Sequence, residues 1–326
     1  MRVSNQENLE LLLKLWGVGD SVEIIEENIT YETEREAHIW TINKDYILKM
    51  TDSEAEMKNN ISVANLLSKA NIPAQKVVVQ VGGEEYGSLD NRYFGLFTKI
   101  KGQVLKDYFE GDYLKRAHYL GQCIAELHKG LLSITDELKE DKDIWDNNMV
   151  NELTGWVSDE IDRYMPCCKL PLDEIDKFND IYNDMKANFQ FIYSKLPRQV
   201  IHRDMHGENM IFDNEKLVGY IDFDLSQINA RIYDICYLGT GSLVTVFHDV
   251  DKREKWIPFM KNIIQGYDSV ANLSYEEKQS IKDMLYLIEL IMVAYFAQNN
   301  YFDIADKNIE MINWISSIWD RLEIVG

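Results

Sequence analysis

The chain has 326 residues, of which 46% are apolar, so it is long enough for one large domain or two packed lobes with a substantial core. Its 55 acidic residues outnumber its 34 basic residues and give a net charge of −21. Such a field repels phosphate backbones and argues against a nucleic-acid partner. The same charge would attract cationic small molecules, or it would serve only to keep the protein soluble.

Cysteine usage and hydropathy favour a cytoplasmic location. The four cysteines include no C-x-x-C pair, so neither a zinc site nor a disulfide framework is indicated, as expected in a reducing cytosol. Residues 1–16 lack a signal-peptide pattern and carry apolar residues at helical spacing. The longest apolar run, residues 284–297, is too short to span a membrane and contains Glu289, so it predicts a buried helix. We therefore expect no membrane partner.

The order of strand-like and helix-like segments predicts an α+β fold. Short β-prone runs surround one helix, residues 61–70, in the first hundred residues, at 22–25, 37–42, 46–50, 76–81 and 93–100. Helical periodicity dominates after Gly102, at 113–129, 131–196 and 256–322, with strand and loop character at 200–212 and 217–223. The pattern predicts a β-rich lobe, residues 1–101, and a larger helical lobe, residues 102–326.

The most informative stretch of the sequence lies between residues 200 and 234. His202-Arg203-Asp204 is followed five positions after Asp204 by Asn209, and Asp222 follows after a predicted hairpin. Phosphoryl transfer needs a carboxylate near the attacking hydroxyl and oxygen ligands for the Mg²⁺ that binds the phosphates. Asp204 suits the first role, and Asn209 and Asp222 suit the second. The spacing therefore predicts a site for phosphoryl transfer.

These loops resemble the catalytic and metal-binding loops of the protein-kinase-like superfamily. Asp222-Phe223-Asp224 and Arg231-Ile232-Tyr233-Asp234 are more similar to aminoglycoside phosphotransferases and the related choline, homoserine and spore-coat-type kinases. A protein kinase would show D-F-G and a long activation segment that ends in A-P-E. Here Asp224 replaces the glycine, and only eleven residues, 224–234, lead to Asp234. The resemblance covers most of the chain and implies a bilobal protein-kinase-like fold.

The resemblance also implies roles for the residues of these loops. Asp204 would be the catalytic base or the group that orients the acceptor hydroxyl, and Asn209 and Asp222 would hold Mg²⁺. His202, together with Asp234, would support the catalytic loop. His206 would either touch the substrate or be an ordinary loop histidine.

The upstream residues carry the nucleotide side of the resemblance. Lys49, on an alternating strand, matches the family lysine that reaches the α- and β-phosphates of ATP. The helix glutamate that should pair with this lysine falls on Glu56, with Asn60 one turn later as the alternative. The backbone C=O of Thr98 and N–H of Ile100 match the positions that bind adenine. A G-x-G-x-x-G phosphate loop is absent from the turn at residues 28–36, a departure that favours the small-molecule kinases over protein kinases.

The sequence as a whole predicts transfer of the ATP γ-phosphate to a hydroxyl of a small molecule. Aminoglycosides, choline-like amino alcohols, homoserine and sugars remain open as acceptors. The negative charge favours an acceptor that also carries an amine, and Glu289 would meet that amine, face water or pair with a lysine. The alternative is a catalytically inactive kinase fold that acts as a binding or coat protein, against which the intact Lys49, Asp204, Asn209 and Asp222 argue.

Overall fold

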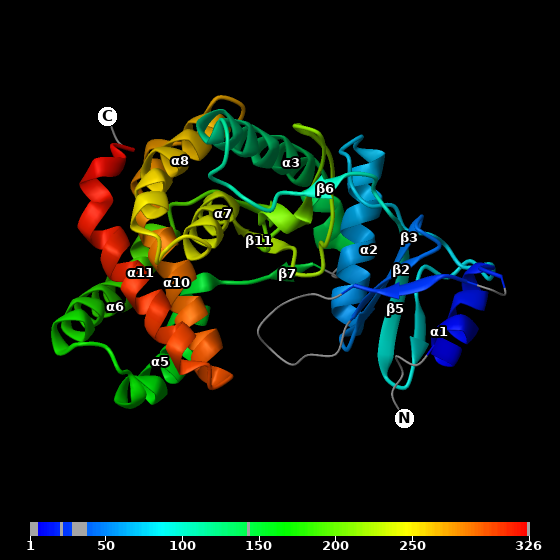
Figure 1. Ribbon diagram of the computed structural model, residues 1–326, viewed down its shortest axis with the longest axis horizontal. Helices are drawn as coiled ribbons and strands as arrows, with labels where there is room; N and C mark the ends of the chain where they lie inside the picture. Colours follow the sequence, from blue (N-terminus) through cyan, green and yellow to red (C-terminus); the bar gives the residue numbers. More distant parts are fainter. Residues whose placement is uncertain (1–5, 20–21, 28–37, 142–143, 325–326) are drawn as a thin grey trace. The chain divides into compact units, whose positions relative to one another are not determined.

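The computed structural model describes residues 6–19, 22–27, 38–141 and 144–324. They form two compact units, which Figure 1 shows coloured along the sequence. The first unit contains Met1–Leu105, Ser133–Ile144 and Gly207–Ser226, and the second contains Lys106–Leu132, Trp145–His206 and Gln227–Gly326. The first unit therefore includes the hairpin with Asn209 and Asp222 as well as the N-terminal strands. The expected phosphate-loop turn at 28–36 lies outside the described residues.

The first unit is built on an antiparallel sheet with the strand order β1-β2-β3-β5-β4. Its strands are β1 (Ile24–Glu26), β2 (Ile39–Ile42), β3 (Tyr46–Thr51), β4 (Gly87–Leu89) and β5 (Arg92–Thr98). The turn between β2 and β3 has positive φ angles at Asn43 and Lys44. In the register of the sheet, Lys49 on β3 lies opposite Ile39 and Gly95.

Helices cover both faces of this sheet (Figure 1). Helix α1 (Gln6–Leu13) and a 3-10 turn (Lys14–Trp16) share a core with Leu48 and Met50 of β3. On the other face, Met57 and Ile61 of α2 (Glu54–Lys69) pack on Phe97. Since neighbouring side chains of a strand point to opposite faces, Lys49 lies on the face that α2 covers.

A second sheet of the first unit positions Asn209 and Asp222. It has the order β10-β9-β6, with β6 (Gln103–Val104), β9 (Met210–Asp213) and β10 (Lys216–Tyr220). The antiparallel pairing of β9 with β10 leaves Asn214 and Glu215 as the turn, as the sequence predicts. At the open end of the hairpin the Ile221 N–H donates to the Asn209 carbonyl at 3.1 Å. The hairpin thus brings the two segments together.

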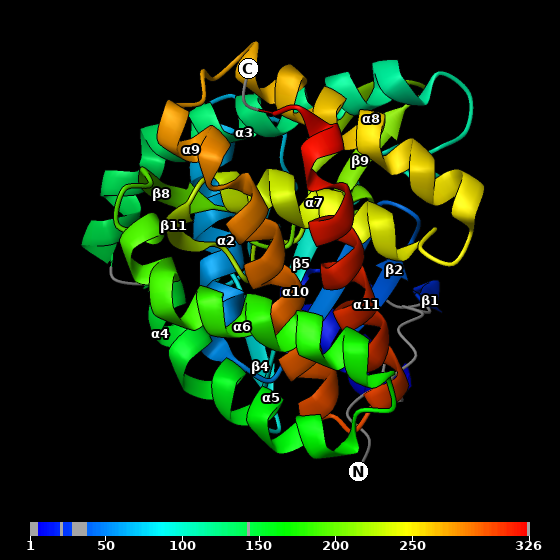
Figure 2. The ribbon, with the colours of Figure 1, turned by 90° about the vertical axis from the view of Figure 1, so that its left-hand side faces the viewer.

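The second unit consists mainly of helices around a small sheet with the order β7-β11-β8. Helix α10 packs on α7, α5 and α11, and Figure 2 shows α6 crossing in front of α10 and α11. None of the helices in the described ranges is long and apolar enough to cross a membrane. Helix α3 (Tyr113–Asp141) belongs to this unit up to Leu132. The other elements of the unit are β7 (Trp145–Asp146), α4 (Met149–Glu152), α5 (Ser158–Tyr164), α6 (Leu172–Tyr193), β8 (Arg198–Ile201), β11 (Gln227–Ala230), α7 (Ile232–Val244), α8 (Val250–Asp268), α9 (Tyr275–Gln279), α10 (Ile281–Gln298) and α11 (Phe302–Ile318).

The structure corrects several expected element boundaries. The segment 76–81 is not a regular strand but makes a single bridge, Val77 to Phe97, because the Val81 N–H turns away to the Leu15 carbonyl. Helix α2 begins at Glu54 rather than at residue 61, since the Ser53 hydroxyl caps its first turn. Strands β7 and β11 were not expected. The buried helix predicted at 284–297 is confirmed as part of α10.

A close approach of α3 and α8 gives a prediction about stability. A Cβ atom added to Gly121 would overlap the Ile263 carbonyl and the Tyr267 nitrogen, which are backbone atoms that cannot rotate away. We expect Gly121→Ala to lower the free energy of unfolding by about 2 kcal/mol or more in urea denaturation. The matched control is Gly241→Ala on α7, where a Cβ meets nothing within 4 Å. Alanine should there raise stability by about 0.5–1 kcal/mol. Equal effects of the two changes would contradict the close approach.

Candidate active site

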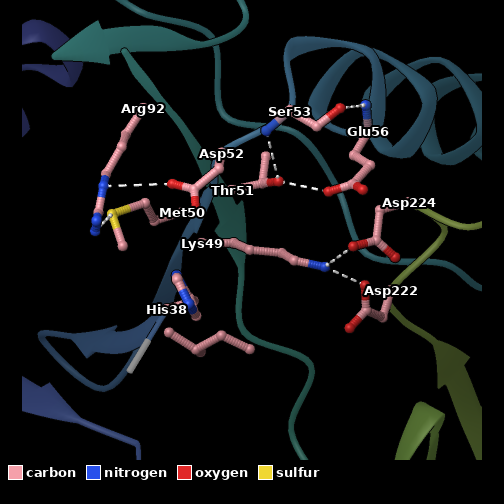
Figure 3. A pocket seen from close by; sticks show the side chains of 11 residues that line it. His38, Lys49, Met50, Thr51, Asp52, Ser53, Glu56, Arg92, Asp222 and Asp224 are labelled. Atoms are coloured by element: carbon pink, nitrogen blue, oxygen red, sulfur yellow. Dashed lines mark hydrogen bonds and ion pairs between the residues drawn. The ribbon is translucent and has the colours of Figure 1, made fainter. Parts of the chain in front are cut away.

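Lys49 lies between two carboxylates (Figure 3). Its Nζ donates to Asp222 and, at 2.8 Å, to Asp224 Oδ2. These residues line a pocket of about 750 Å³ in the first unit, together with Thr51, Glu56 and others. The pocket therefore places Lys49 against two acidic side chains from the segment after β10, and its lining also includes Arg92, Asp52 and Glu56.

These contacts change the pKa values of Lys49 and Asp224. Burial alone would lower the pKa of Lys49, but the two carboxylates outweigh it and raise that pKa above its usual range. Burial raises the pKa of Asp224 to about 6, with Lys49 opposing the rise and Asp222 adding to it. At neutral pH the lysine is charged and most Asp224 side chains are ionised, so the trio carries a net negative charge.

The expected ion pair between Glu56 and Lys49 is not formed. Glu56 lines the same pocket, but its Oε2 accepts a hydrogen bond of 2.6 Å from the Thr51 hydroxyl, and the ion pairs of Lys49 go to Asp222 and Asp224. The alternative, Asn60, does not face Lys49 either, since its Oδ1 accepts from Gln75 and from a backbone N–H. Sequence spacing placed Glu56 near the lysine but gave no sign that Asp224 would be its partner.

Asp222 and Asn209 carry oxygen atoms that suit a hard divalent cation. Asp222 is the second residue after β10 and has a φ of 70°. Asn209 is buried at the end of the 3-10 turn Gly207–Asn209, which precedes β9. Carboxylate and amide oxygens are the ligands that Mg²⁺ accepts alongside water and phosphate. Among the described residues there is no cluster of three or more His, Cys, Asp or Glu that could hold a metal alone. The oxygens of Asp222 and Asn209 are of the type that fits a hard divalent cation.

Asp204 is a partly buried carboxylate in the second unit. His206 Nε2 lies 3.3 Å from its Oδ2. Burial would raise the pKa of Asp204, but the hydrogen bond and charge of His206, the charge of His202 and a hydrogen bond from Tyr237 together lower it well below its usual range. Asp204 is therefore ionised at neutral pH and can accept a hydrogen bond from a hydroxyl.

A buried network holds the loop that carries Asp204. The Asp234 carboxylate accepts hydrogen bonds of 2.9 Å from the backbone N–H groups of His202 and Arg203. The Nε2 atom of His128 lies 2.8 Å from the same carboxylate, and its Nδ1 lies 2.7 Å from the Tyr267 hydroxyl. The Nε2–H of His128 can donate to this carboxylate. Asp234 thus has the contacts expected of a loop support, whereas no sequence pattern indicated His128 as its partner.

Arg203 extends this support. Its φ of 71° lies in the left-handed region, where a non-glycine residue is strained. Its guanidinium donates at 2.6 Å to both Gln227 and Glu152, which ties the loop to β11 and α4. A bidentate guanidinium with two fixed partners can hold a backbone conformation that its own sterics disfavour.

Thr98 and Ile100, the expected adenine contacts, line a second pocket of about 410 Å³ in the first unit. The Thr98 N–H donates to the Lys76 carbonyl at 2.9 Å, and the Lys99 N–H donates to the Asp45 carbonyl at 2.7 Å. Backbone bonds on both sides of the strand end therefore fix the course of this segment. Its role in binding a base stays a prediction.

The comparisons with known proteins decide the family. Residues 32–269 match the phosphotransferase enzyme family, APH. The chain belongs to this family. The resemblance to aminoglycoside phosphotransferases and related kinases is thereby confirmed.

Individual relatives are distant in sequence. The homoserine kinase of Zymomonas mobilis is 22% identical over 270 residues, which cover 82% of this chain and 75% of that protein. The structure of amicoumacin kinase hAmiN in complex with AMP-PNP, Ca²⁺ and Ami matches with a TM-score of 0.68 at 17% identity, covering 94% of this chain and 93% of that one. The microcompartment-associated aminopropanol kinase matches with a TM-score of 0.70 at 14% identity, covering 98% and 100%. The structural matches confirm the bilobal α+β protein-kinase-like fold.

Glu289 is a buried carboxylate on α10 in the second unit, with 1% of its surface exposed. Its Oε2 has no hydrogen-bond partner among the described residues, and the nearby Lys307 donates to the Val244 carbonyl. Burial raises the pKa of Glu289 to about 8, and the charge of Lys307 opposes the rise. The expected alternative of a side chain facing water is therefore wrong.

The raised pKa of Glu289 predicts a pH dependence of stability. The folded state keeps the proton up to about pH 8, whereas the unfolded chain loses it near its ordinary value of 4.5. The free energy of unfolding should therefore fall as pH rises through this window, by up to about 1.4 kcal/mol per pH unit from this group. Urea denaturation from pH 5 to 8 should show a shallower fall in Glu289→Gln, and the same change at the exposed Glu276 is the control. Parallel curves for wild type and Glu289→Gln would contradict the shift.

Proposed function

We propose that this protein is a small-molecule kinase that transfers the γ-phosphate of ATP to a substrate hydroxyl. The observation that carries the proposal is the Lys49 side chain held by Asp222 and Asp224 in a pocket of the first unit. Membership of the phosphotransferase enzyme family supports it.

On the nucleotide side, Lys49 would exchange its carboxylate partners for oxygens of the α- and β-phosphates. Asn209 and Asp222 would hold Mg²⁺, which supplies charge neutralisation on the phosphates when bound. The backbone groups of Thr98 and Ile100 would bind the adenine. Glu56 would line the pocket beside Lys49, where its hydrogen bond to Thr51 fixes the start of α2.

Asp204 would orient the acceptor hydroxyl and receive its proton late in the transfer. Its lowered pKa makes it a weak base, which suits a loose phosphoryl-transfer transition state in which little proton transfer is needed early. His202 would act through the loop backbone, since its N–H is bonded to Asp234.

The acceptor that we propose carries an amine as well as a hydroxyl. Homoserine and aminopropanol, the compounds in the names of two relatives, have both groups. The net charge of −21 favours the approach of an ammonium group. Glu289 at neutral pH holds its proton, so a contact with an ammonium would have to lower its pKa again.

Two matched changes separate the proposed roles of the acidic residues. Asp204→Asn should lower ATP turnover by about 10²- to 10⁴-fold, because the hydroxyl loses its proton acceptor. It should keep the melting shift that ATP causes in the presence of Mg²⁺. Asp222→Asn should lose most of that shift, because a neutral amide holds a hard dication less well than a carboxylate.

The outcomes distinguish a kinase from an inactive relative. Turnover of Asp204→Asn at the wild-type rate would contradict the assignment of Asp204. A wild-type protein that binds ATP but turns over no hydroxyl compound in a broad screen would instead support the alternative of a binding or coat protein. Asp251→Asn, an exposed change on α8, is the control for effects of charge alone.

The acceptor proposal is tested with pairs of compounds that differ only in an amine. Amino alcohols should show a higher kcat/KM than the matched alcohols without nitrogen, and the preference should shrink at high salt because screening weakens attraction to the negative protein. Homoserine and aminopropanol belong in the panel. Better turnover of neutral sugars or polyols, with a preference that salt does not change, would contradict an amine-bearing acceptor.

A further inference from the structure

Two adjacent asparagines of α2, Asn59 and Asn60, are completely buried. They lie on the same helix as Met57 and Ile61, which pack in an apolar core. Burying an amide among apolar groups is unfavourable unless its hydrogen bonds are satisfied. These two buried amides therefore need hydrogen-bond partners that offset the cost of removing them from water.

Asn59 supplies donors to the backbone of the segment that follows Asp222. Its Nδ2 lies 2.7 Å from the carbonyl oxygen of Ser226, 2.9 Å from that of Asp224 and 3.3 Å from that of Phe223. Three carbonyl oxygens around one atom can be matched only by the amide nitrogen, so the orientation of the amide is fixed. Its Oδ1 has no hydrogen-bond partner among the described residues.

Asn60 supplies an acceptor to the same segment. Its Oδ1 accepts from the Phe223 N–H at 3.1 Å and from Gln75 Nε2 at 2.6 Å. Phe223 lies between the two aspartates that contact Lys49. The two asparagines therefore bind both the N–H and C=O sides of this short stretch of backbone.

The hydrogen bonds of Asn59 and Asn60 connect α2 to the candidate site, where an ion pair between Glu56 and Lys49 was expected. Glu56 does not pair with Lys49, so no α2 side chain reaches the lysine by an ion pair in the described part of the chain. Helix α2 instead contacts the backbone that carries the partners of Lys49. Helix α2 and residues 223–226 are thus joined by hydrogen bonds from asparagine side chains to backbone groups, and not by an ion pair.

We propose that Asn59 and Asn60 are positioning residues that hold residues 222–226 in the conformation that binds Mg²⁺ with ATP. This inference rests on the proposed function. The two side chains act through the backbone: they fix the peptide groups on either side of Phe223, and these peptides set where the Asp222 and Asp224 carboxylates stand. Loss of the Asn59 donors leaves three carbonyl groups with fewer partners and frees the segment to shift.

The test compares the same chemical change at the two positions. Asn60→Asp keeps an oxygen that accepts from Phe223 and Gln75, whereas Asn59→Asp replaces two N–H donors by a carboxyl group that has at most one. Both changes bury a carboxyl group at a position that is 0% exposed, so their general cost to folding is matched. Asn59→Leu, which removes every donor, is the second variant, and Asn65→Leu on the same helix is the control.

The measured quantity is the Mg²⁺ concentration that gives half of the ATP-dependent melting shift. It should rise about tenfold or more in Asn59→Asp and Asn59→Leu and change by less than about threefold in Asn60→Asp and Asn65→Leu. ATP binding without Mg²⁺ should stay within about threefold of wild type in all variants that fold, because the contacts of Lys49 with phosphate are not removed. A purely structural role would instead weaken ATP binding equally with and without the metal.

The possible results are distinguishable. Wild-type Mg²⁺ dependence in both Asn59 variants, or an equal effect of Asn59→Asp and Asn60→Asp, would overturn the positioning role and leave the proposed function standing. If Asn59→Leu does not fold, the two aspartate variants decide. Absence of any ATP-dependent shift in the wild-type protein would overturn the proposed function, and this inference with it.

Discussion

The ion pairs of Lys49 with Asp222 and Asp224 are the interaction on which the first unit depends. They join β3, which lies in the middle of the five-stranded sheet, to the end of a hairpin more than 170 residues later in the sequence. Partly buried charges are costly to desolvate, and they are tolerated only where each has partners of opposite sign. The α2 helix and the β9–β10 hairpin supply the framework that holds these partners in place.

Both candidate loops contain a residue with strained backbone, and each is supported in a similar way. Arg203 and Asp222 have φ angles of 71° and 70°, although neither is glycine. The backbone N–H of Arg203 is bonded to Asp234, and the N–H that follows Asp222 is bonded to Asn60. A buried side-chain acceptor fixes the peptide at each strained position, as expected where strain has to be offset by the surroundings.

The sequence predicted elements formed by neighbouring residues, but not the contacts between residues that lie far apart in the chain. The spacing of Asp204, Asn209 and Asp222 predicted a hairpin that joins two loops, because a turn and two short strands leave few alternatives. Helical spacing placed Glu56 close to Lys49. It could not predict which carboxylate forms the ion pair with Lys49, because that depends on where the distant segment with Asp222 and Asp224 packs. The same reason hides His128, whose contact with Asp234 spans 106 residues. Residues 76–81 have strand propensity, but the path of their neighbours limits them to one bridge.

The charge of the trio has a consequence for how ligands would bind under the proposed function. Lys49 carries one positive charge against two carboxylates, so the pocket is net negative when Asp224 is ionised. A polyanionic nucleotide alone would meet repulsion there and would have to draw Lys49 away from both aspartates. Asp222 would hold Lys49 less strongly if it also bound a cation, and Lys49 could then turn to the phosphates. Metal and nucleotide should therefore each raise the other's affinity by the same factor. Under the proposed positioning role, the backbone bonds from Asn59 and Asn60 would keep the carboxylates in place during this exchange, which side-chain ion pairs alone would not do once the lysine has left.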